Sequence, residues 1–287
     1  MYEEHFGFRD PPFQITPDPR FLYLTRSHRD ALAYLNYGIR ERKGILVLAG
    51  EVGVGKTLMV RTLLSQLPED VGTAVVMNAR LTFKQLLYLA LLDFGRRPGG
   101  RTKVDLLLAL QEHLLMLRDQ GRNALLVVDE AQTLSEESLE EFRLLSNLET
   151  STQKLLQILL VGQPELKATL SRHSLRQLRQ RIPGICDLSA LTPDSVSEYV
   201  EHRLQVASGG RCAGLFQREA LERVARYSEG IPRLINQVCD RALLVGYARG
   251  ADRIEGDHVR EAVRELEEGF IGPAPIAASA IPARDAR

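Results

Sequence analysis

The sequence predicts an α/β protein: a parallel five-stranded sheet flanked by helices, followed by a small all-helical domain. As far as residue 191, short apolar runs alternate with helical stretches, a pattern typical of parallel sheets that are covered on both faces. From Thr192 onwards the apolar runs stop. Helical stretches then follow one another, separated by glycines.

Composition sets the first limits on function. The chain has 287 residues, enough for one α/β domain and a small helical one. Its 37 basic and 37 acidic side chains cancel, so there is no overall attraction to nucleic acid or to an anionic membrane, although a local basic patch would suffice to bind DNA. The sequence shows no signal-peptide pattern and no apolar run near the ~20 residues that cross a bilayer. We therefore expect a soluble, cytoplasmic protein.

The three cysteines show neither metal-binding spacing nor an even count, and we expect free thiols in a reducing compartment. They are Cys186, Cys212 and Cys239.

The first 24 residues are predicted to be loop-like, because four prolines interrupt them between residues 11 and 19. A helix is expected over residues 27–42, and its apolar face is made by Ala31, Leu32, Leu35 and Ile39.

The alternating region supplies the sheet. Its predicted strands cover residues 45–50, 73–79, 124–129, 155–162 and 184–191. Its predicted helices begin near Lys56, cover residues 82–94 and 103–118, and open again at Ser135. In the last third, Thr192-Pro193 is a helix start, and helices are predicted at residues 193–207, 217–228, 232–248 and 256–268. The Pro- and Ala-rich residues 271–287 are expected to be disordered.

We divide the chain accordingly into four parts. They are an N-terminal segment at residues 1–26, the α/β domain at 27–191, the helical domain at 192–269, and a tail at 270–287.

A nucleotide site is predicted where the first strand meets the next helix. The string GEVGVGKT fits the phosphate-binding pattern G-x-x-x-x-G-K-[ST], between a predicted strand and a predicted helix as that motif requires. Backbone N–H groups of such a loop wrap the phosphates. The lysine reaches the β- and γ-phosphates, and the threonine ligates Mg²⁺. The predicted ATP-binding residues are Gly50, Glu51, Val52, Gly53, Val54, Gly55, Lys56 and Thr57.

Two acids end the third strand, in the string LLVVDEAQ. Asp129 is placed to hold Mg²⁺ with Thr57, and Glu130 to orient or deprotonate the attacking water. A pair of solvated acids after a strand is the alternative. Ala131 and Gln132 are expected to begin the turn toward Ser135. DEAQ also occurs in helicases, but no second α/β unit follows residue 191, which disfavours such a motor.

Together these features resemble an AAA+ ATPase: the phosphate-binding loop (P-loop), VVDE, a fourth strand that ends before Gln163, a helical domain, and GIPR at residues 230–233. The resemblance implies that Gln163 is sensor 1, which senses the γ-phosphate. That family usually has Asn, Ser or Thr at this position. The resemblance also implies that Arg233 is sensor 2, a cation that reaches the nucleotide from the helical lid. A loop polar residue and an ordinary helix-start arginine are the alternatives.

Residues 171–181 (SRHSLRQLRQR) are strongly basic. In AAA+ proteins an arginine finger, which completes a neighbouring subunit's site, comes from just before the fifth strand. The resemblance therefore makes Arg179 and Arg181 candidates and implies an ATP-dependent homo-oligomer. A solvated basic surface or a nucleic-acid contact is the alternative.

The N-terminal string FGFRDPPFQITPDPRFLYL and the string GQPEL at residues 162–166 resemble ExeA-type general secretion pathway ATPases, over about residues 1–268. In that family the N-terminal segment lies over the adenine side of the site, which implies contacts from Tyr23, Leu24 and His28. Core packing is the alternative for these side chains. Full-length members continue into a membrane helix and a peptidoglycan-binding domain, so this chain resembles a short form.

The functional expectation is a Mg²⁺-dependent ATPase that drives assembly or positioning of a cell-envelope complex for secretion, pili or exopolysaccharide export. Its partners would be proteins of that complex, which recruit it to the inner membrane. The alternative is a DNA-associated ATPase of the transposition or initiator type, suggested by arginines within residues 172–181 and at 211, 218, 223 and 226. A switch that binds ATP without hydrolysing it is disfavoured by Glu130.

Overall fold

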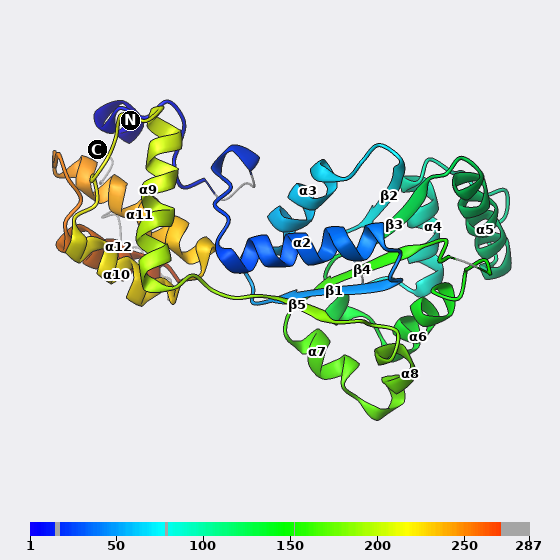
Figure 1. Cartoon of the computed structure of the whole chain (residues 1–287). Coiled ribbons are helices and arrows are strands. Elements are labelled where there is room, and N and C mark those ends of the chain that lie inside the picture. The colour runs from blue at the N-terminus through cyan, green and yellow to red at the C-terminus, as the bar shows by residue number, and fades with distance from the viewer. Residues whose placement is uncertain (15–17, 78–79, 152, 271–287) are drawn as a thin grey trace, which may run out of the picture. The chain divides into compact units, whose positions relative to one another are not determined.

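The computed structural model describes residues 1–14, 18–77, 80–151 and 153–270, which form two compact units (Figure 1). One is an α/β unit of residues 18–191 together with 231–233. The other is a helical unit of residues 1–14, 192–230 and 234–270. The expected disordered tail at 271–287 lies outside the described residues.

The α/β unit contains five parallel strands in the order β2-β3-β4-β1-β5, which confirms the predicted fold class. The second strand ends three residues earlier than predicted, and residues 78 and 79 lie outside the described part of the chain. The strands are β1 (Ile45–Gly50), β2 (Val71–Val76), β3 (Asn123–Val128), β4 (Gln157–Gly162) and β5 (Ile185–Leu188).

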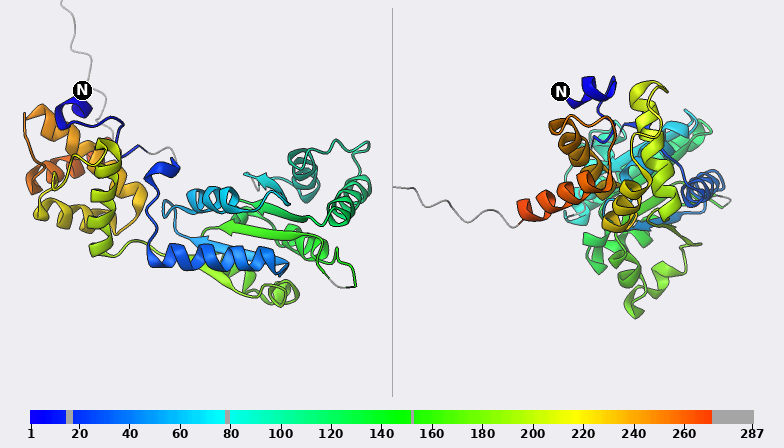
Figure 2. Two further views of the ribbon diagram at one scale, coloured as in Figure 1. Left: turned by 45° about the horizontal axis from the view of Figure 1, so that its top comes forward. Right: turned by 90° about the vertical axis from the view of Figure 1, so that its left-hand side faces the viewer.

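Helices cover both faces of the sheet (Figures 1 and 2). Alternate residues of a strand point to opposite faces, so β1, β3 and β4 are buried along their whole length. Ile45 and Val47 pack with α4 (Phe83–Asp93), α5 (Lys103–Asp119) and α6 (Glu136–Leu145). Leu46 and Leu48 face α2 (Arg26–Arg40) and α3 (Lys56–Gln66).

Between β4 and β5 lie short helices to which the sequence analysis assigned no element. Four leucines there are buried against the α4–α6 face of the sheet, and this burial holds the short turns in place: Leu166, Leu170, Leu175 and Leu178. The elements are α7 (Glu165–Leu170), η3 (His173–Leu175) and α8 (Arg176–Arg179).

Side-chain caps fix where most of the predicted helices begin. The hydroxyls of Thr25, Thr82, Thr102, Ser135 and Thr192 each accept a backbone N–H from the first turn of the following helix. Such a cap contributes about 1 kcal/mol to helix stability. The helix boundaries were therefore readable from the sequence to within one or two residues.

Besides residues 1–14, the helical unit contains α9 (Pro193–Ser208), α10 (Arg218–Ser228), most of α11 (Pro232–Ala248), and α12 (Gly256–Phe270). Its N-terminal chain is tied to α9 by Arg203, which is only 6% exposed. The Arg203 Nε donates to the Pro12 carbonyl oxygen at 2.5 Å, and Nη2 donates to that of Gln14 at 3.3 Å. Within the described residues, no helix is long and apolar enough to cross a membrane.

The prediction that the first 24 residues are loop-like was wrong at their start, where α1 (Tyr2–Phe6) forms. The prolines responsible for that prediction all come later. Tyr2 and Phe6 lie one turn apart and are both buried in the helical unit, and Gly7, at φ 75°, ends the helix. The predicted N-terminal segment, residues 1–26, is divided between the two units: residues 1–14 belong to the helical unit, and residues 18–26 belong to the α/β unit.

We predict that His113 makes the α/β unit less stable in mild acid. Its ring is buried in α5, and Nδ1 accepts a hydrogen bond from Arg96 Nε at 2.8 Å. Burial, with the charges of Arg96 and Arg122, lowers the pKa of His113. The unfolded chain binds a proton near pH 6.5, where the folded chain does not, so the free energy of unfolding falls as pH drops below that value.

Chemical denaturation at pH 7.5 and 5.5 measures this effect. The substitution His113→Gln keeps an acceptor for Arg96 without titrating, and should reduce the loss of stability between the two pH values. Substituting the exposed His173 by Gln is the control and should leave that loss unchanged. Equal losses in wild type and His113→Gln would contradict the assignment.

Candidate functional site

The P-loop joins β1 to α3, as predicted. Gly50 is the last residue of the strand and Lys56 the first of the helix. Gly53 and Gly55 have φ values of 86° and 100°, which residues with a side chain rarely adopt. Free backbone N–H groups at a helix start favour anions. The loop therefore has the strand–loop–helix form that phosphate binding needs.

Lys56 is held inside this loop and is only 8% exposed. Its Nζ donates to the carbonyl oxygens of Gly50 at 2.7 Å and Glu51 at 2.9 Å. Burial lowers the pKa of Lys56, and the charges of Glu130 and Asp129 oppose that effect. The buried ammonium group thus donates to two neutral carbonyl oxygens. A charged phosphate oxygen would be a stronger acceptor and would replace them favourably.

Asp129 directly follows β3 and is 6% exposed. Its N–H donates to the Val76 carbonyl at 2.9 Å, and its Oδ1 accepts the Glu130 N–H at 2.8 Å. Burial raises the pKa of Asp129, whereas the Glu130 N–H, the Lys56 charge and a hydrogen bond with Thr57 lower it. The structure therefore brings together the two side chains predicted to hold a metal, Asp129 and Thr57.

A hydroxyl and a carboxylate are oxygen ligands of the kind that Mg²⁺ prefers. Within the described part of the chain, no three His, Cys, Asp or Glu side chains cluster in a way that could hold a metal by themselves. A Mg²⁺ ion usually takes one or two protein oxygens and completes its shell with phosphates and water. Thr57 and Asp129 would hold it.

Glu130 lies beside Gln163, the residue that follows β4. The Gln163 Nε2 donates to Glu130 Oε2 at 3.4 Å, so two residues predicted from distant parts of the sequence meet. Glu130 itself has φ 55°, an unusual value for a residue with a side chain, and its side chain is exposed. Strained backbone of this kind is concentrated at functional sites.

The contacts of Gln132 were not predicted from the sequence. It lies in η2 (Ala131–Thr133), the turn that we predicted, but its side chain also contacts both Glu130 and Gln163. The available signal was a polar residue two positions after the predicted general base.

Arg233 packs against the P-loop within the α/β unit. Its N–H donates to the Gly53 carbonyl at 3.2 Å. A Cβ added at Gly53 would lie 2.8 Å from the Arg233 Cβ and 3.0 Å from the Ile231 Cγ2, so this glycine also leaves room for the contact. The residue predicted to be sensor 2 therefore lies next to the phosphate-binding backbone.

Of the three predicted adenine-side residues, His28 reaches the P-loop. It is buried, it pairs through Nδ1 with Thr25 Oγ1 at 2.5 Å, and it has a hydrogen bond with the Val54 main chain. Leu24 packs against the core between the sheet and α2–α3. Contact of Tyr23, Leu24 or His28 with adenine stays a prediction.

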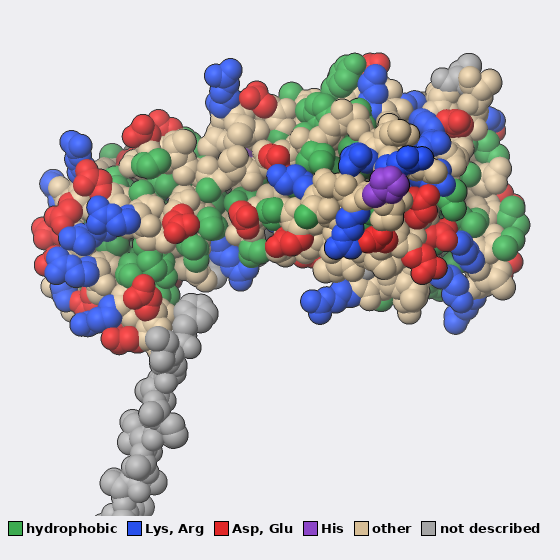
Figure 3. All heavy atoms as spheres, turned by 90° about the horizontal axis from the view of Figure 1, so that it is seen from below, with side chains coloured by type: hydrophobic (Ala, Val, Ile, Leu, Met, Phe, Trp, Pro, Cys, Tyr) green, Lys and Arg blue, Asp and Glu red, His purple; other side chains and the backbone are tan. Residues whose placement is uncertain are grey.

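The two candidate finger arginines are not part of this cluster. Arg179 is exposed on α8, and its Nη1 donates to the Ser171 carbonyl at 3.1 Å. In the described ranges, no hydrogen bond or ion pair joins Arg179 or Arg181 to the P-loop or to Glu130. Figure 3 looks onto the side of the unit where α7 and α8 lie, and basic side chains gather there with acidic ones beside them.

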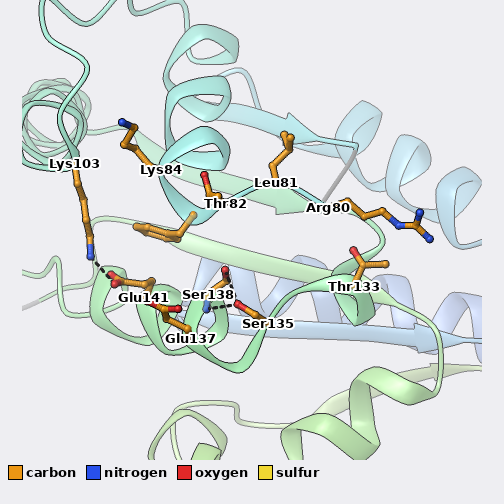
Figure 4. A pocket seen from close by; sticks show the side chains of 11 residues that line it. Arg80, Leu81, Thr82, Lys84, Lys103, Thr133, Ser135, Glu137, Ser138 and Glu141 are labelled. Atoms are coloured by element: carbon orange, nitrogen blue, oxygen red, sulfur yellow. Dashed lines mark hydrogen bonds and ion pairs between the residues drawn. The ribbon is translucent and has the colours of Figure 1, made fainter.

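A separate cavity of about 600 Å³ lies beyond the ends of β2 and β3 (Figure 4). The starts of α4 and α6 form its walls, with Lys103 of α5 paired to Glu141 at 2.5 Å. Thr133, which follows Glu130 by three residues, also lines it, but no P-loop residue does. It is therefore a neighbour of the nucleotide site and not the site itself.

Comparison with known proteins agrees with this geometry. Residues 39–170 match the AAA domain family. The chain is 43% identical to general secretion pathway protein A of Aeromonas hydrophila over 270 residues, which is 93% of this chain and 48% of that protein. It therefore spans about half the length of that relative. It is also 24% identical to the ATP-dependent target DNA activator B of Escherichia phage Mu, over 78% of this chain and 67% of that one.

Among solved structures, the ORC2 protein of Aeropyrum pernix in ADPNP and ADP complexes aligns with a TM-score of 0.68 and 22% identity, covering 90% of this chain and 72% of that one. This likeness concerns the fold. The P-loop, the acids after β3, the sheet order and the helical unit agree with the sequence relationship: the chain carries an AAA+ P-loop ATPase domain and belongs with the relatives of general secretion pathway protein A.

Proposed function

We propose that this protein hydrolyses ATP to ADP and phosphate in a Mg²⁺-dependent reaction. The observation that carries the proposal is the convergence of Glu130 and Gln163 beside the Thr57–Asp129 pair, at the strand ends next to the P-loop. A protein that only bound nucleotide would need the loop and the metal ligands. It would not need an exposed carboxylate held next to them by a second side chain.

Each residue has a role in this reaction. The P-loop N–H groups and Lys56 bind and orient the phosphates. Thr57 and Asp129 would hold Mg²⁺, and the ion would supply positive charge to balance the charge that develops on the phosphate oxygens. Glu130 accepts the proton of the attacking water. Gln163, which follows β4, and Arg233, in the first turn of α11, contact the γ-phosphate region and respond to whether a γ-phosphate is present.

The process that we propose for this activity is assembly or positioning of a cell-envelope complex for secretion, pili or exopolysaccharide export. Support comes from the relative at 43% identity, which is named for the general secretion pathway. In this proposal the protein acts from the cytoplasmic side as a homo-oligomer, and partner proteins of the envelope complex bring it to the inner membrane.

A DNA-associated role is the second candidate, favoured by the relationship to the phage Mu target DNA activator. Several of the arginines first considered for DNA are engaged in ion pairs. Arg172 pairs with Glu136, Arg218 with Glu222, and Arg223 with Glu219. An acidic partner lowers the local positive potential that such an arginine offers to a phosphate, so we rank this candidate second.

We predict that Glu130→Gln keeps ATP binding and lowers turnover by about 10²- to 10⁴-fold, because the amide cannot accept the proton from water. Phosphate release gives the turnover, and a fluorescent ATP analogue gives the dissociation constant. Turnover close to that of wild type would remove Glu130 as the base. Repeating the wild-type assay with duplex DNA separates the two candidate processes, since strong stimulation at low salt would favour the DNA-associated role.

We also predict that Arg179 or Arg181 completes the site of a neighbouring subunit. Substituting that arginine by Ala should lower turnover by about 10³-fold without loss of ATP binding. Mixing this variant with Lys56→Ala, which supplies the arginine but binds no ATP, should restore about a quarter of wild-type turnover if the subunits mix randomly.

Arg172→Ala is the matched control, because this residue of the same basic segment is already paired with Glu136. It should turn over normally. If neither finger variant regains activity on mixing, the arginines do not act in a neighbour's site.

A further inference from the structure

The side chain of Gln132 forms a bridge between two parts of the site. Its Nε2 donates to Glu130 Oε2 at 2.6 Å, and its Oε1 accepts the backbone N–H of Gln163 at 3.0 Å. One amide thus joins the candidate base, which follows β3, to the main chain at the end of β4. The two ends of the bridge are 33 residues apart in the sequence.

Space for this bridge is built into β4. Gly162 is the last residue of that strand and pairs in register with Ala49, which precedes the P-loop. A Cβ added at Gly162 would lie 2.9 Å from Gln132 Oε1 and 3.2 Å from its backbone N. Such distances are closer than ordinary contact, so any side chain at Gly162 would displace the Gln132 amide.

The turn itself does not need the Gln132 side chain. Other groups make its hydrogen bonds: the Thr133 N–H and Oγ1 donate to the Glu130 carbonyl at 3.0 and 2.8 Å, and the Leu134 N–H donates to the Ala131 carbonyl at 3.2 Å. The two contacts of the Gln132 amide are therefore not needed to form this turn.

The shorter of the two hydrogen bonds to the Glu130 carboxylate comes from Gln132. Among the described residues, its donors are Gln132 at 2.6 Å and Gln163 at 3.4 Å, and the longer contact is weak. Both donate to Oε2. The other oxygen, Oε1, accepts no hydrogen bond from the described residues.

We propose that Gln132 is a positioning residue for ATP hydrolysis: its amide holds Glu130 with one oxygen facing the attacking water and couples that orientation to Gln163. The proposal rests on the hydrolysis proposed above. An amide suits the task because it donates to a carboxylate and accepts from an N–H at the same time. A carboxylate at this position would repel Glu130, and an apolar side chain would leave the Gln163 N–H without a partner.

The test uses the full chain with Gln132→Met, which preserves length and loses both hydrogen bonds, and Gln132→Glu, which keeps an acceptor for the Gln163 N–H but loses the donor. We expect the turnover number to fall by about 10- to 100-fold in Gln132→Met, because misplacing a catalytic group by about 1 Å has effects of this size. Gln132→Glu should lose at least as much. The dissociation constant for the ATP analogue should stay near the wild-type value in both variants. The melting temperature should fall by no more than a few degrees in Gln132→Met, where the Gln163 N–H loses its partner.

A second measurement separates positioning from a structural effect. In a Glu130→Gln background there is no base to orient, so adding Gln132→Met should change the residual turnover less than about twofold. A structural role would lower it by the same factor in both backgrounds. Gln111→Met, an exposed glutamine on α5, is the matched control and should behave as wild type.

The outcomes are distinct. If wild type turns over ATP and Gln132→Met does so equally well, this proposal is wrong and the hydrolytic function stands. If Gln132→Met loses ATP binding together with turnover, or acts equally in both backgrounds, the amide is structural and the proposal is also wrong. If wild type releases no more phosphate than Glu130→Gln, the proposed hydrolysis fails, and the role of Gln132 fails with it.

Discussion

The register of the parallel strands is the constraint on which the site depends. Ala49 in β1 pairs with Gly162 in β4, and Val128 in β3 pairs with Leu160 in β4. Because all three strands run in the same direction, the P-loop, Asp129 and the residue after β4 emerge together at one edge. A slip of one residue would exchange the side chains that pack under the two helical layers, because alternate residues of a strand face opposite sides of the sheet. Burial of these strands on both faces therefore also fixes where the P-loop, Asp129 and Gln163 lie relative to one another.

Burial at that edge balances opposite charges. Lys56 and Asp129 are both almost covered, and burial moves the pKa of each in the direction that favours its neutral form. The charge of Asp129 raises the pKa of Lys56, and the charge of Lys56 lowers the pKa of Asp129, so each residue opposes the effect of burial on the other. Glu130, by contrast, is exposed and must be oriented, since the solvent imposes no single rotamer on it. In the proposed mechanism the neutral amides of Gln132 and Gln163, which both donate to Glu130, would orient this carboxylate without adding charge to the site.

The helical unit is organised by a different interaction. Arg203 is buried and donates to main-chain carbonyls of the N-terminal chain, so two segments about 190 residues apart form one compact body. Phe13 adds an edge-to-face contact with Phe216. A charged group buried in this way is costly to leave unpaired, so the N-terminal chain is held where those carbonyls are available.

The sequence by itself determined the fold class, the P-loop and the acids after β3, because each is encoded in a short stretch whose pattern needs no distant partner. Apolar runs specify buried strands, and glycine, lysine and threonine at fixed spacing specify a phosphate loop. Only the tertiary structure decided that α1 forms, since its stability comes from burying Tyr2 and Phe6 against residues more than 190 positions away. It also decided the contacts of Gln132, because a glutamine's partners depend on which strand end the sheet places beside it.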